Sequence, residues 1–140
     1  MKRSVIDASV LIKLFLPEPD SPAATRVVTN QAELLAPNLI WVECANVVWK
    51  RQARGQLAAE DAKQLVREIL QVPLEIDASP GLVSDAIELA VKTGQTVYNC
   101  LYLALAIRSD CQLITADERF ARAIAKTSAT KNVRVLSGEK

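Results

Sequence analysis

The sequence contains no histidine among its 140 residues. This absence excludes general acid–base catalysis by histidine, Ser-His-Asp triads and the histidine ligand sets typical of zinc hydrolases. The three cysteines, Cys44, Cys100 and Cys111, are widely spaced and each lies in an apolar context. Their odd number and spacing favour neither a disulfide framework nor a paired-cysteine metal site. Any catalysis must therefore depend mainly on carboxylates, and we expect free thiols in a reducing cytoplasm.

The sequence also lacks a long hydrophobic run. Its most apolar segment, residues 101–107, is far shorter than the roughly 20 residues of a membrane-spanning helix. Near the N-terminus, Asp7 and Lys13 interrupt the apolar run that a signal peptide would need. We therefore expect no transmembrane helix and a cytoplasmic protein.

The net charge is only +1, so the overall charge gives no signal for or against a nucleic-acid partner. Local basic clusters do occur, at residues 50, 51 and 54 and at residues 119, 122 and 126. Half of the residues are hydrophobic, which in 140 residues suffices for one substantial core. We expect a single domain over residues 1–140.

Short apolar segments alternate with helical patterns along the chain. Strands are expected at residues 4–6, 34–36, 74–76, 112–115 and 133–135. Helices are expected at residues 7–15, 21–30, 38–54, 57–70, 82–92, 98–108 and 118–126. This alternation predicts a three-layer α/β/α sandwich with a central, mostly parallel sheet. In such sheets ligands bind outside the carboxyl ends of the strands.

Three carboxylates interrupt apolar segments: Asp7 and Asp117 each follow a strand, and Glu43 lies inside an apolar helix. Because charge is costly to bury unless an opposite charge meets it, the set indicates a shared cation. Asp7 and Asp117 should lie at one edge of the sheet. Either residue could alternatively serve only as the N-cap of the helix that follows it.

Helical spacing aligns Glu43 with three further polar residues, Asn46, Lys50 and Arg54. If this stripe faces the cleft, Glu43 lies near a cation, Asn46 orients it, and Lys50 and Arg54 are available to phosphates. The alternative is an ordinary solvated helix face.

Asn99 opens the most apolar helix, three residues after Thr96. It could assist local capping, or its carbonyl could ligate a hard cation. Ser9 and Thr115 flank the same strand ends, and their hydroxyls could support the carboxylates or cap locally.

Four segments resemble a PIN-domain protein, and more narrowly a VapC-type toxin. They are Val5-Ile6-Asp7-Ala8-Ser9-Val10-Leu11, then Glu43 with Asn46, then residues 97–106 with their Tyr-x-x-x-Tyr-Leu-Ala-Leu-Ala pattern, and Leu113-Ile114-Thr115-Ala116-Asp117. The resemblance covers nearly the whole chain in the right order, and residues 97–106 are its most specific part.

The resemblance implies an α/β/α sandwich and an Mg²⁺- or Mn²⁺-dependent endoribonuclease, usually dimeric and inhibited by a small antitoxin. It maps the metal-binding acids onto Asp7, Glu43 and Asp117. At the fourth catalytic position this sequence has Asn99, where the family usually has Asp. Asn99 is thus compatible with a native variant of reduced activity, with metal binding without cleavage, or with an engineered change.

Other functions remain possible at this stage. The main rival is a noncatalytic PIN-like module that binds RNA or a protein partner through the same cleft. A haloacid-dehalogenase-type phosphatase would need Asp where Ser9 stands, and no receiver-type acidic pair is evident. For a dimer or an antitoxin segment, residues 15–22 and the helix pair at 38–70 offer apolar surface.

Overall fold

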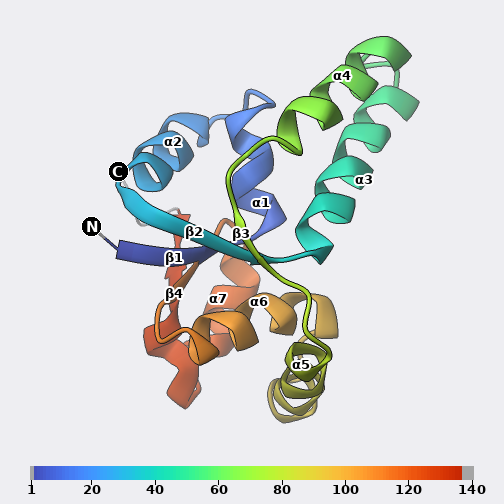
Figure 1. The fold of residues 1–140 in the computed structure, drawn as a ribbon. Coiled ribbons are helices and arrows are strands. Elements are labelled where there is room, and N and C mark those ends of the chain that lie inside the picture. The colour runs from blue at the N-terminus through green and yellow to red at the C-terminus, as the bar shows by residue number, and fades with distance from the viewer. Residues whose placement is uncertain (1, 137–140) are drawn as a thin grey trace.

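The strands form one parallel sheet in the computed structural model, which describes residues 2–136 (Figure 1). The sheet has five strands in the order β3-β2-β1-β4-β5, and every neighbouring pair is parallel. The strands are β1 (Lys2–Ile6), β2 (Gln31–Pro37), β3 (Glu75–Asp77), β4 (Gln112–Thr115) and β5 (Val133–Val135). The predicted α/β/α architecture is therefore confirmed.

Helices cover both faces of the sheet. On one face lie α1 (Ala8–Leu11), α2 (Ser21–Thr29), α3 (Leu39–Ala53) and α4 (Ala59–Ile69), and on the other lie α5 (Pro80–Thr93), α6 (Val97–Arg108) and α7 (Glu118–Ile124) (Figure 1). Two 3₁₀ helices, Ile12–Leu14 and Ser128–Asn132, complete the chain. Helix α6 crosses the centre of the sheet, where it contacts β1, β2 and β4. Its burial explains its almost wholly apolar sequence.

The direction of the strand order changes at β1. From β1 the chain proceeds outward through β2 to β3, and after α5 and α6 it returns to β4 on the other side of β1. A crevice for ligands forms at such a switch point, outside the carboxyl ends of the two strands. Ile6 pairs with Ile114 in the register. The residues that follow them, Asp7 and Thr115, therefore emerge side by side.

Several element bounds differ from the sequence-based prediction: β1 begins at Lys2 rather than at residue 4, and the helix predicted at residues 7–15 is α1 followed by the 3₁₀ helix Ile12–Leu14. Strand β2 runs from Gln31 to Pro37, longer than the predicted 34–36. A proline lacks an N–H but is tolerated at a strand end. The 3₁₀ helix Ser128–Asn132 was not predicted. Gly94 ends α5 in the left-handed conformation (φ 74°), which favours glycine at a helix C-terminus.

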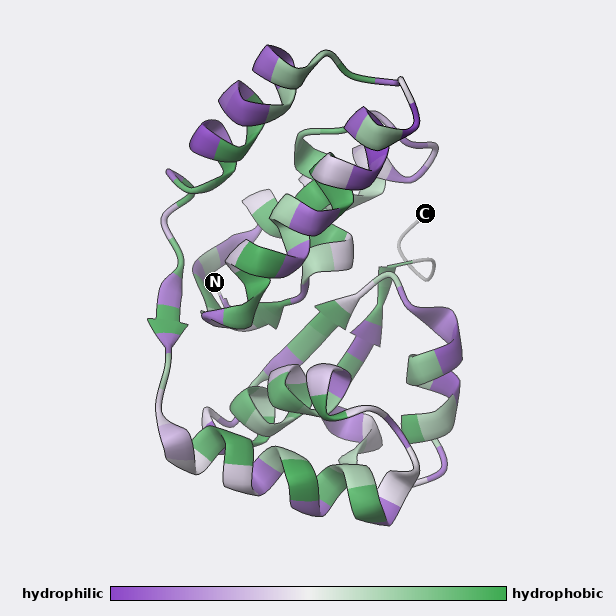
Figure 2. Cartoon of the chain, turned by 90° about the vertical axis from the view of Figure 1, so that its right-hand side faces the viewer, coloured by the Kyte–Doolittle hydropathy of each residue, from purple (hydrophilic) through white to green (hydrophobic). Residues whose placement is uncertain are grey.

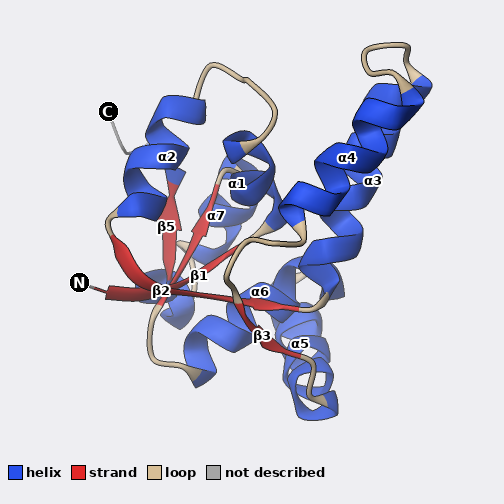
Figure 3. Ribbon diagram, turned by 45° about the horizontal axis from the view of Figure 1, so that its top comes forward, coloured by secondary structure: helices blue, strands red, loops and turns tan. Residues whose placement is uncertain are grey.

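Helices α3 and α4 form a pair that projects beyond the rest of the molecule (Figures 1 and 3). Hydrophilic residues lie along the outer side of α4, while the strands are mostly hydrophobic (Figure 2). None of the helices in residues 2–136 combines the length and apolar character needed to cross a membrane.

Candidate active site

Asp7 lies at the switch point, directly after β1, and is 9% exposed. Its Oδ1 accepts hydrogen bonds from Ser9 Oγ at 2.5 Å and from the backbone N–H of Val10 at 3.3 Å. Its Oδ2 accepts one from Thr115 Oγ1 at 2.5 Å. Asp7 is thus the N-cap of α1, as its alternative interpretation proposed, and it is also held from β4 by a side chain distant in the sequence.

The two hydroxyl groups that contact Asp7 also join the ends of β1 and β4. Ser9 Oγ accepts a hydrogen bond from the backbone N–H of Ala116 at 3.0 Å. Thr115 Oγ1 accepts one from the backbone N–H of Asp117 at 3.0 Å. Each hydroxyl therefore donates to the carboxylate and accepts from the β4 loop. This arrangement fixes Asp7 and positions the backbone of Asp117 at the same edge of the sheet.

Glu43 approaches this edge from α3, with its side chain half-buried. Tyr102, in the middle of α6, donates a hydrogen bond from its hydroxyl to Oε1 of Glu43. Tyr102 is 2% exposed and is among the largest fully buried side chains. Sequence reasoning missed this residue, because its neighbours in α6 are apolar and its partner is 59 positions away. A hydroxyl within an otherwise apolar helix was the available signal.

Asp7 and Glu43 lie close enough for their charges to interact. The pKa of Asp7 is raised from 3.8 to about 6, mainly by burial and to a smaller extent by the neighbouring Glu43 carboxylate, against the lowering effect of its hydrogen bonds. Burial also raises the pKa of Glu43, which the hydrogen bond from Tyr102 partly counteracts. Cys44 has its pKa raised to about 12, first by burial and then by both carboxylates. Its thiol therefore stays protonated at neutral pH.

The other two predicted members of the site have separate surroundings. Asp117 is half-buried, and its Oδ1 accepts a hydrogen bond from the backbone N–H of Phe120 at 3.0 Å, so it caps α7. Asn99 is half-buried at the start of α6, where its backbone N–H donates to Thr96 Oγ1 at 3.2 Å. Its side chain makes no hydrogen bond with another residue in the described part of the chain. Asn99 and Tyr102, three positions apart, are neighbours on α6.

The donor chemistry of this edge suits a hard cation. Within residues 2–136, no lysine or arginine forms a salt bridge with Asp7, Glu43 or Asp117. In the same range, no group of three or more acidic or cysteine side chains is arranged to hold a metal ion. Mg²⁺ needs fewer, since it usually binds one or two carboxylates and keeps several waters. Asp7 and Glu43 provide two carboxylates at this edge, and a cation bound by them, with or without Asp117, stays a prediction.

The predicted polar stripe continues along α3 away from the sheet. Asn46, Lys50 and Arg54 are exposed. Among the described residues, neither basic side chain of this stripe has an ion-pair partner, whereas their neighbour Arg51 pairs with Glu18 at 3.1 Å. Both stripe cations are therefore available to an anionic ligand.

The sequence matches a family model described as PIN domain over residues 4–126. A curated relative, Ribonuclease VapC3 of Pyrobaculum aerophilum, is 35% identical over 119 residues, which cover 84% of this chain and 91% of the relative. Ribonuclease VapC3 of Mycobacterium tuberculosis is 27% identical, with 85% of each chain covered.

Solved structures also have this fold. A crystallised protein from Pyrobaculum aerophilum aligns with a TM-score of 0.70 at 23% identity, over 99% of this chain and 92% of that one. A toxin-antitoxin complex from Klebsiella pneumoniae aligns with a TM-score of 0.63 at 16% identity, over 95% of this chain and 97% of that one. The sarcin-ricin loop cleaving toxin VapC20 of Mycobacterium tuberculosis aligns with a TM-score of 0.66 at 15% identity, over 85% of this chain and 93% of that one.

Proposed function

Because the chain belongs to the PIN-domain family, we propose that it is a metal-dependent endoribonuclease and the toxin of a type II toxin-antitoxin pair. The main support is the pair Asp7 and Glu43 at the switch point, where the charge of Glu43 acts on Asp7. No basic side chain among the described residues forms an ion pair with either carboxylate. Two relatives are named ribonucleases, which favours RNA as the substrate.

We assign the cation, Mg²⁺ or Mn²⁺, to Asp7 and Glu43, with Asp117 as the third carboxylate ligand. When bound, the ion supplies Lewis-acid stabilisation of the scissile phosphate and lowers the pKa of a bound water. Ser9 and Thr115 hold both oxygens of Asp7 in place. Asn99, at the start of α6, adds a neutral carbonyl donor where a fourth acid would add charge, so its presence weakens the site.

RNA phosphates are assigned to Lys50 and Arg54. Lys50 is exposed on the helix that carries Glu43 and Arg54 is exposed at its C-cap, so an RNA strand along α3 would have its phosphates near these cations. Asn46 lies between them and Glu43, one turn from the carboxylate, where it can hydrogen-bond the cation's water or the substrate.

Asn99 also favours a second candidate function, a noncatalytic module that binds RNA or a protein partner through the same crevice. A neutral amide there reduces the negative charge that holds a cation. Cleavage of structured RNAs in Mn²⁺ by the purified chain distinguishes the two functions. We expect cleavage that Asp7→Ala abolishes. Cleavage that survives in Asp7→Ala would come from a contaminant and defeat the enzyme assignment, and RNA binding without cleavage would favour the module.

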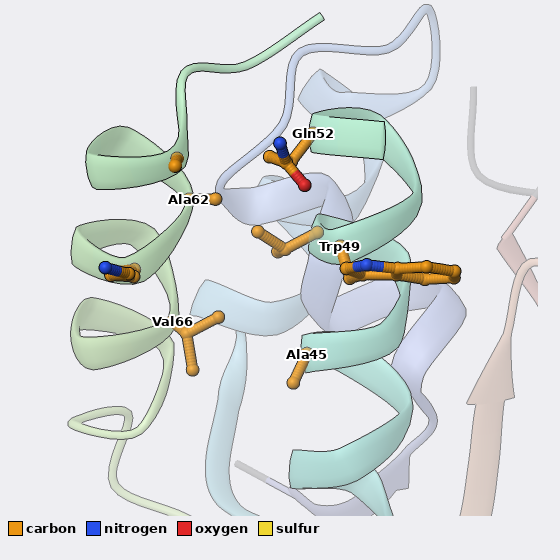
Figure 4. A pocket seen from close by; sticks show the side chains of 8 residues that line it. Ala45, Trp49, Gln52, Ala62 and Val66 are labelled. Carbon is orange, nitrogen blue, oxygen red and sulfur yellow. The ribbon is translucent and has the colours of Figure 1, made fainter. Parts of the chain in front are cut away.

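The antitoxin is assigned to the projecting α3–α4 pair. Ala45 and Gln52 of α3 lie opposite Ala62 and Val66 of α4, and these residues line a groove of about 440 Å³ that is mainly apolar (Figure 4). Trp49, at its edge, is 59% exposed. A chain segment with apolar side chains on one face fits such a groove. The Klebsiella pneumoniae structure is a toxin-antitoxin complex on a similar fold, which supports a protein inhibitor.

Coexpression with the protein encoded beside this gene tests the assignment. We expect the two to copurify, and Ala45→Arg to prevent this by filling the groove with a charged side chain. The matched control is Val91→Arg, at an 80% exposed position on α5, and it should not prevent copurification. Copurification that survives Ala45→Arg would place the antitoxin elsewhere.

We also propose that the chain forms a homodimer and that it is located in a reducing cytoplasm. The three free cysteines suit a reducing compartment. Light scattering over a broad concentration range measures the mass directly. A monomer throughout would defeat the dimer.

A further inference from the structure

A tyrosine in the middle of α6 is unusual because the rest of the helix core is apolar. Tyr102 is 2% exposed, and a buried phenol hydroxyl needs a hydrogen-bond partner. Leucine or phenylalanine would fill the same space without that requirement. The partner it has is the carboxylate of Glu43 on α3, across the layers of the fold.

The two carboxylate oxygens of Glu43 have different surroundings. Oε1 accepts from Tyr102, while Oε2 has no hydrogen bond with the described residues. No buried side-chain oxygen or nitrogen in the described part of the chain lacks a partner, so Oε2 must be accessible to solvent. The phenol thus holds one oxygen of Glu43 in place, while the other stays accessible to solvent.

Asp7, like Glu43, accepts hydrogen bonds from the hydroxyl groups of neighbouring side chains. Its oxygens accept from Ser9 and Thr115, as Glu43 accepts from Tyr102, so all three side-chain donors are neutral hydroxyls. A lysine or arginine at these positions would fix the carboxylates equally well but would cancel their charge. Neutral donors restrict the side chains and leave the negative charge for a cation.

We propose that Tyr102 is a positioning residue for the cation site: its hydroxyl fixes the Glu43 carboxylate so that Oε2 faces the ion. This inference rests on the proposed metal-dependent function. A glutamate side chain has three rotatable bonds, and ordering them when the ion binds would reduce affinity. Tyr102 removes that cost because Glu43 is already ordered in the folded protein.

The alternative is that Tyr102 only fills the core. Tyr102→Phe separates the two roles, because it keeps the ring and removes only the hydroxyl. The matched control is Tyr98→Phe, one turn earlier on α6, at a position 62% exposed and outside the hydrogen bond to Glu43. Glu43→Gln, alone and combined with Tyr102→Phe, tests whether the hydroxyl acts through Glu43.

Two measurements on the full chain are compared. Calorimetry gives the Mn²⁺ affinity, and fluorescence anisotropy in EDTA gives the affinity for a structured RNA without metal. We expect Tyr102→Phe to weaken Mn²⁺ binding about 10-fold and to leave RNA affinity in EDTA unchanged. Tyr98→Phe should change neither. In the Glu43→Gln background, Tyr102→Phe should cause no further loss.

Unchanged Mn²⁺ affinity in Tyr102→Phe would overturn the proposal. An equal loss of Mn²⁺ and RNA affinity would overturn it too, since that pattern indicates general damage to the fold. If the wild-type chain binds Mn²⁺ but does not cleave RNA, the nuclease function fails while the positioning role stands. If the wild type binds no Mn²⁺, both fail.

Discussion

Thr115, the last residue of β4, donates a hydrogen bond of 2.5 Å to Oδ2 of Asp7, which follows β1, although 108 positions separate them in the chain. The bond lies where two parallel strands end side by side and the strand order changes direction. Because Thr115 is fully buried and Asp7 is only 9% exposed, this hydrogen bond fixes the carboxylate within the protein interior at the ends of the two strands.

Replacing Thr115 by valine should cost both stability and metal affinity. Valine keeps the shape but removes the donor to Asp7 and the acceptor for the backbone N–H of Asp117. A hydrogen bond to a charged group contributes about 1.5–3 kcal/mol, so we expect a loss of about 2 kcal/mol in the free energy of unfolding. Urea denaturation in EDTA measures it. Thr115→Ser retains the hydroxyl and should lose less than half as much; equal losses would mean that packing dominates.

Asp7 should make the metal-free protein less stable as the pH rises. Its pKa is about 6 in the folded protein against an ordinary value of 3.8, so between these values the folded state binds more protons than the unfolded state. This pKa difference corresponds to a destabilisation of the folded state by about 3 kcal/mol. The destabilisation is absent below pH ~4 and complete above pH ~6. Asp7→Asn should remove this slope and stabilise the chain at pH 7 by about 1–3 kcal/mol, while abolishing cleavage.

Chemical denaturation in EDTA at a series of pH values tests this. Glu88→Gln, at an exposed position on α5, is the control and should keep the wild-type slope. Added Mn²⁺ should stabilise the wild type and not Asp7→Asn, because the ion binds the folded state. A wild-type slope retained in Asp7→Asn would show that other groups cause it.

The fold was predictable because its signals are local. Apolar strands alternate with amphipathic helices, and this pattern alone indicates a parallel sheet covered on both faces. Strand β2 was predicted too short because its first residues, Gln31, Ala32 and Glu33, are polar or small, and only pairing with β1 makes them a strand. The 3₁₀ helix Ser128–Asn132 has no periodicity long enough to detect.

The site was predictable only in part. Asp7 and Thr115 could be placed at one edge because parallel strands share their carboxyl ends. The bond between Tyr102 and Glu43 joins two helices on opposite faces of the sheet, and no local pattern encodes it. The side chain of Asp117 caps α7, and this depends on side-chain torsions, which spacing does not determine.

Glu18 should stabilise the segment that follows α1. Its Oε2 lies 2.5 Å from Nζ of Lys13, whose side chain is 11% exposed, and its Oε1 lies 3.1 Å from Nη2 of Arg51 on α3. Glu18→Gln leaves the mostly buried ammonium of Lys13 with Asp20 as its remaining carboxylate partner. We therefore expect the free energy of unfolding, measured by urea denaturation, to fall by about 1–2 kcal/mol. Glu60→Gln breaks an exposed pair with Lys63 and should cost at most about 0.5 kcal/mol. Equal costs would contradict a structural role for Glu18.

Lys50 and Arg54 should contribute to RNA affinity through charge alone. We expect Lys50→Gln and Arg54→Gln each to reduce the slope of log affinity against log salt by about 0.7, the value for one single-strand phosphate contact. Anisotropy titrations in EDTA at several salt concentrations measure it. Lys92→Gln, on α5 at the other face of the sheet, should leave the slope unchanged. An unchanged slope in both variants of the stripe would exclude it as the phosphate contact.

Asn99→Asp should strengthen the cation site and increase RNA cleavage. The side chain at this position makes no hydrogen bond with the described residues, so the new carboxylate displaces no internal partner. It lies in the first turn of α6, where negative charge is favourable, so the unfolding free energy should change by less than about 1 kcal/mol. Repulsion from Asp7 and Glu43 should appear only without metal. We expect Mn²⁺ affinity by calorimetry to rise about 10-fold, with Gln71→Glu, at an exposed position after α4 and outside the proposed site, as the control for added charge. Unchanged affinity in Asn99→Asp would remove position 99 from the cation site.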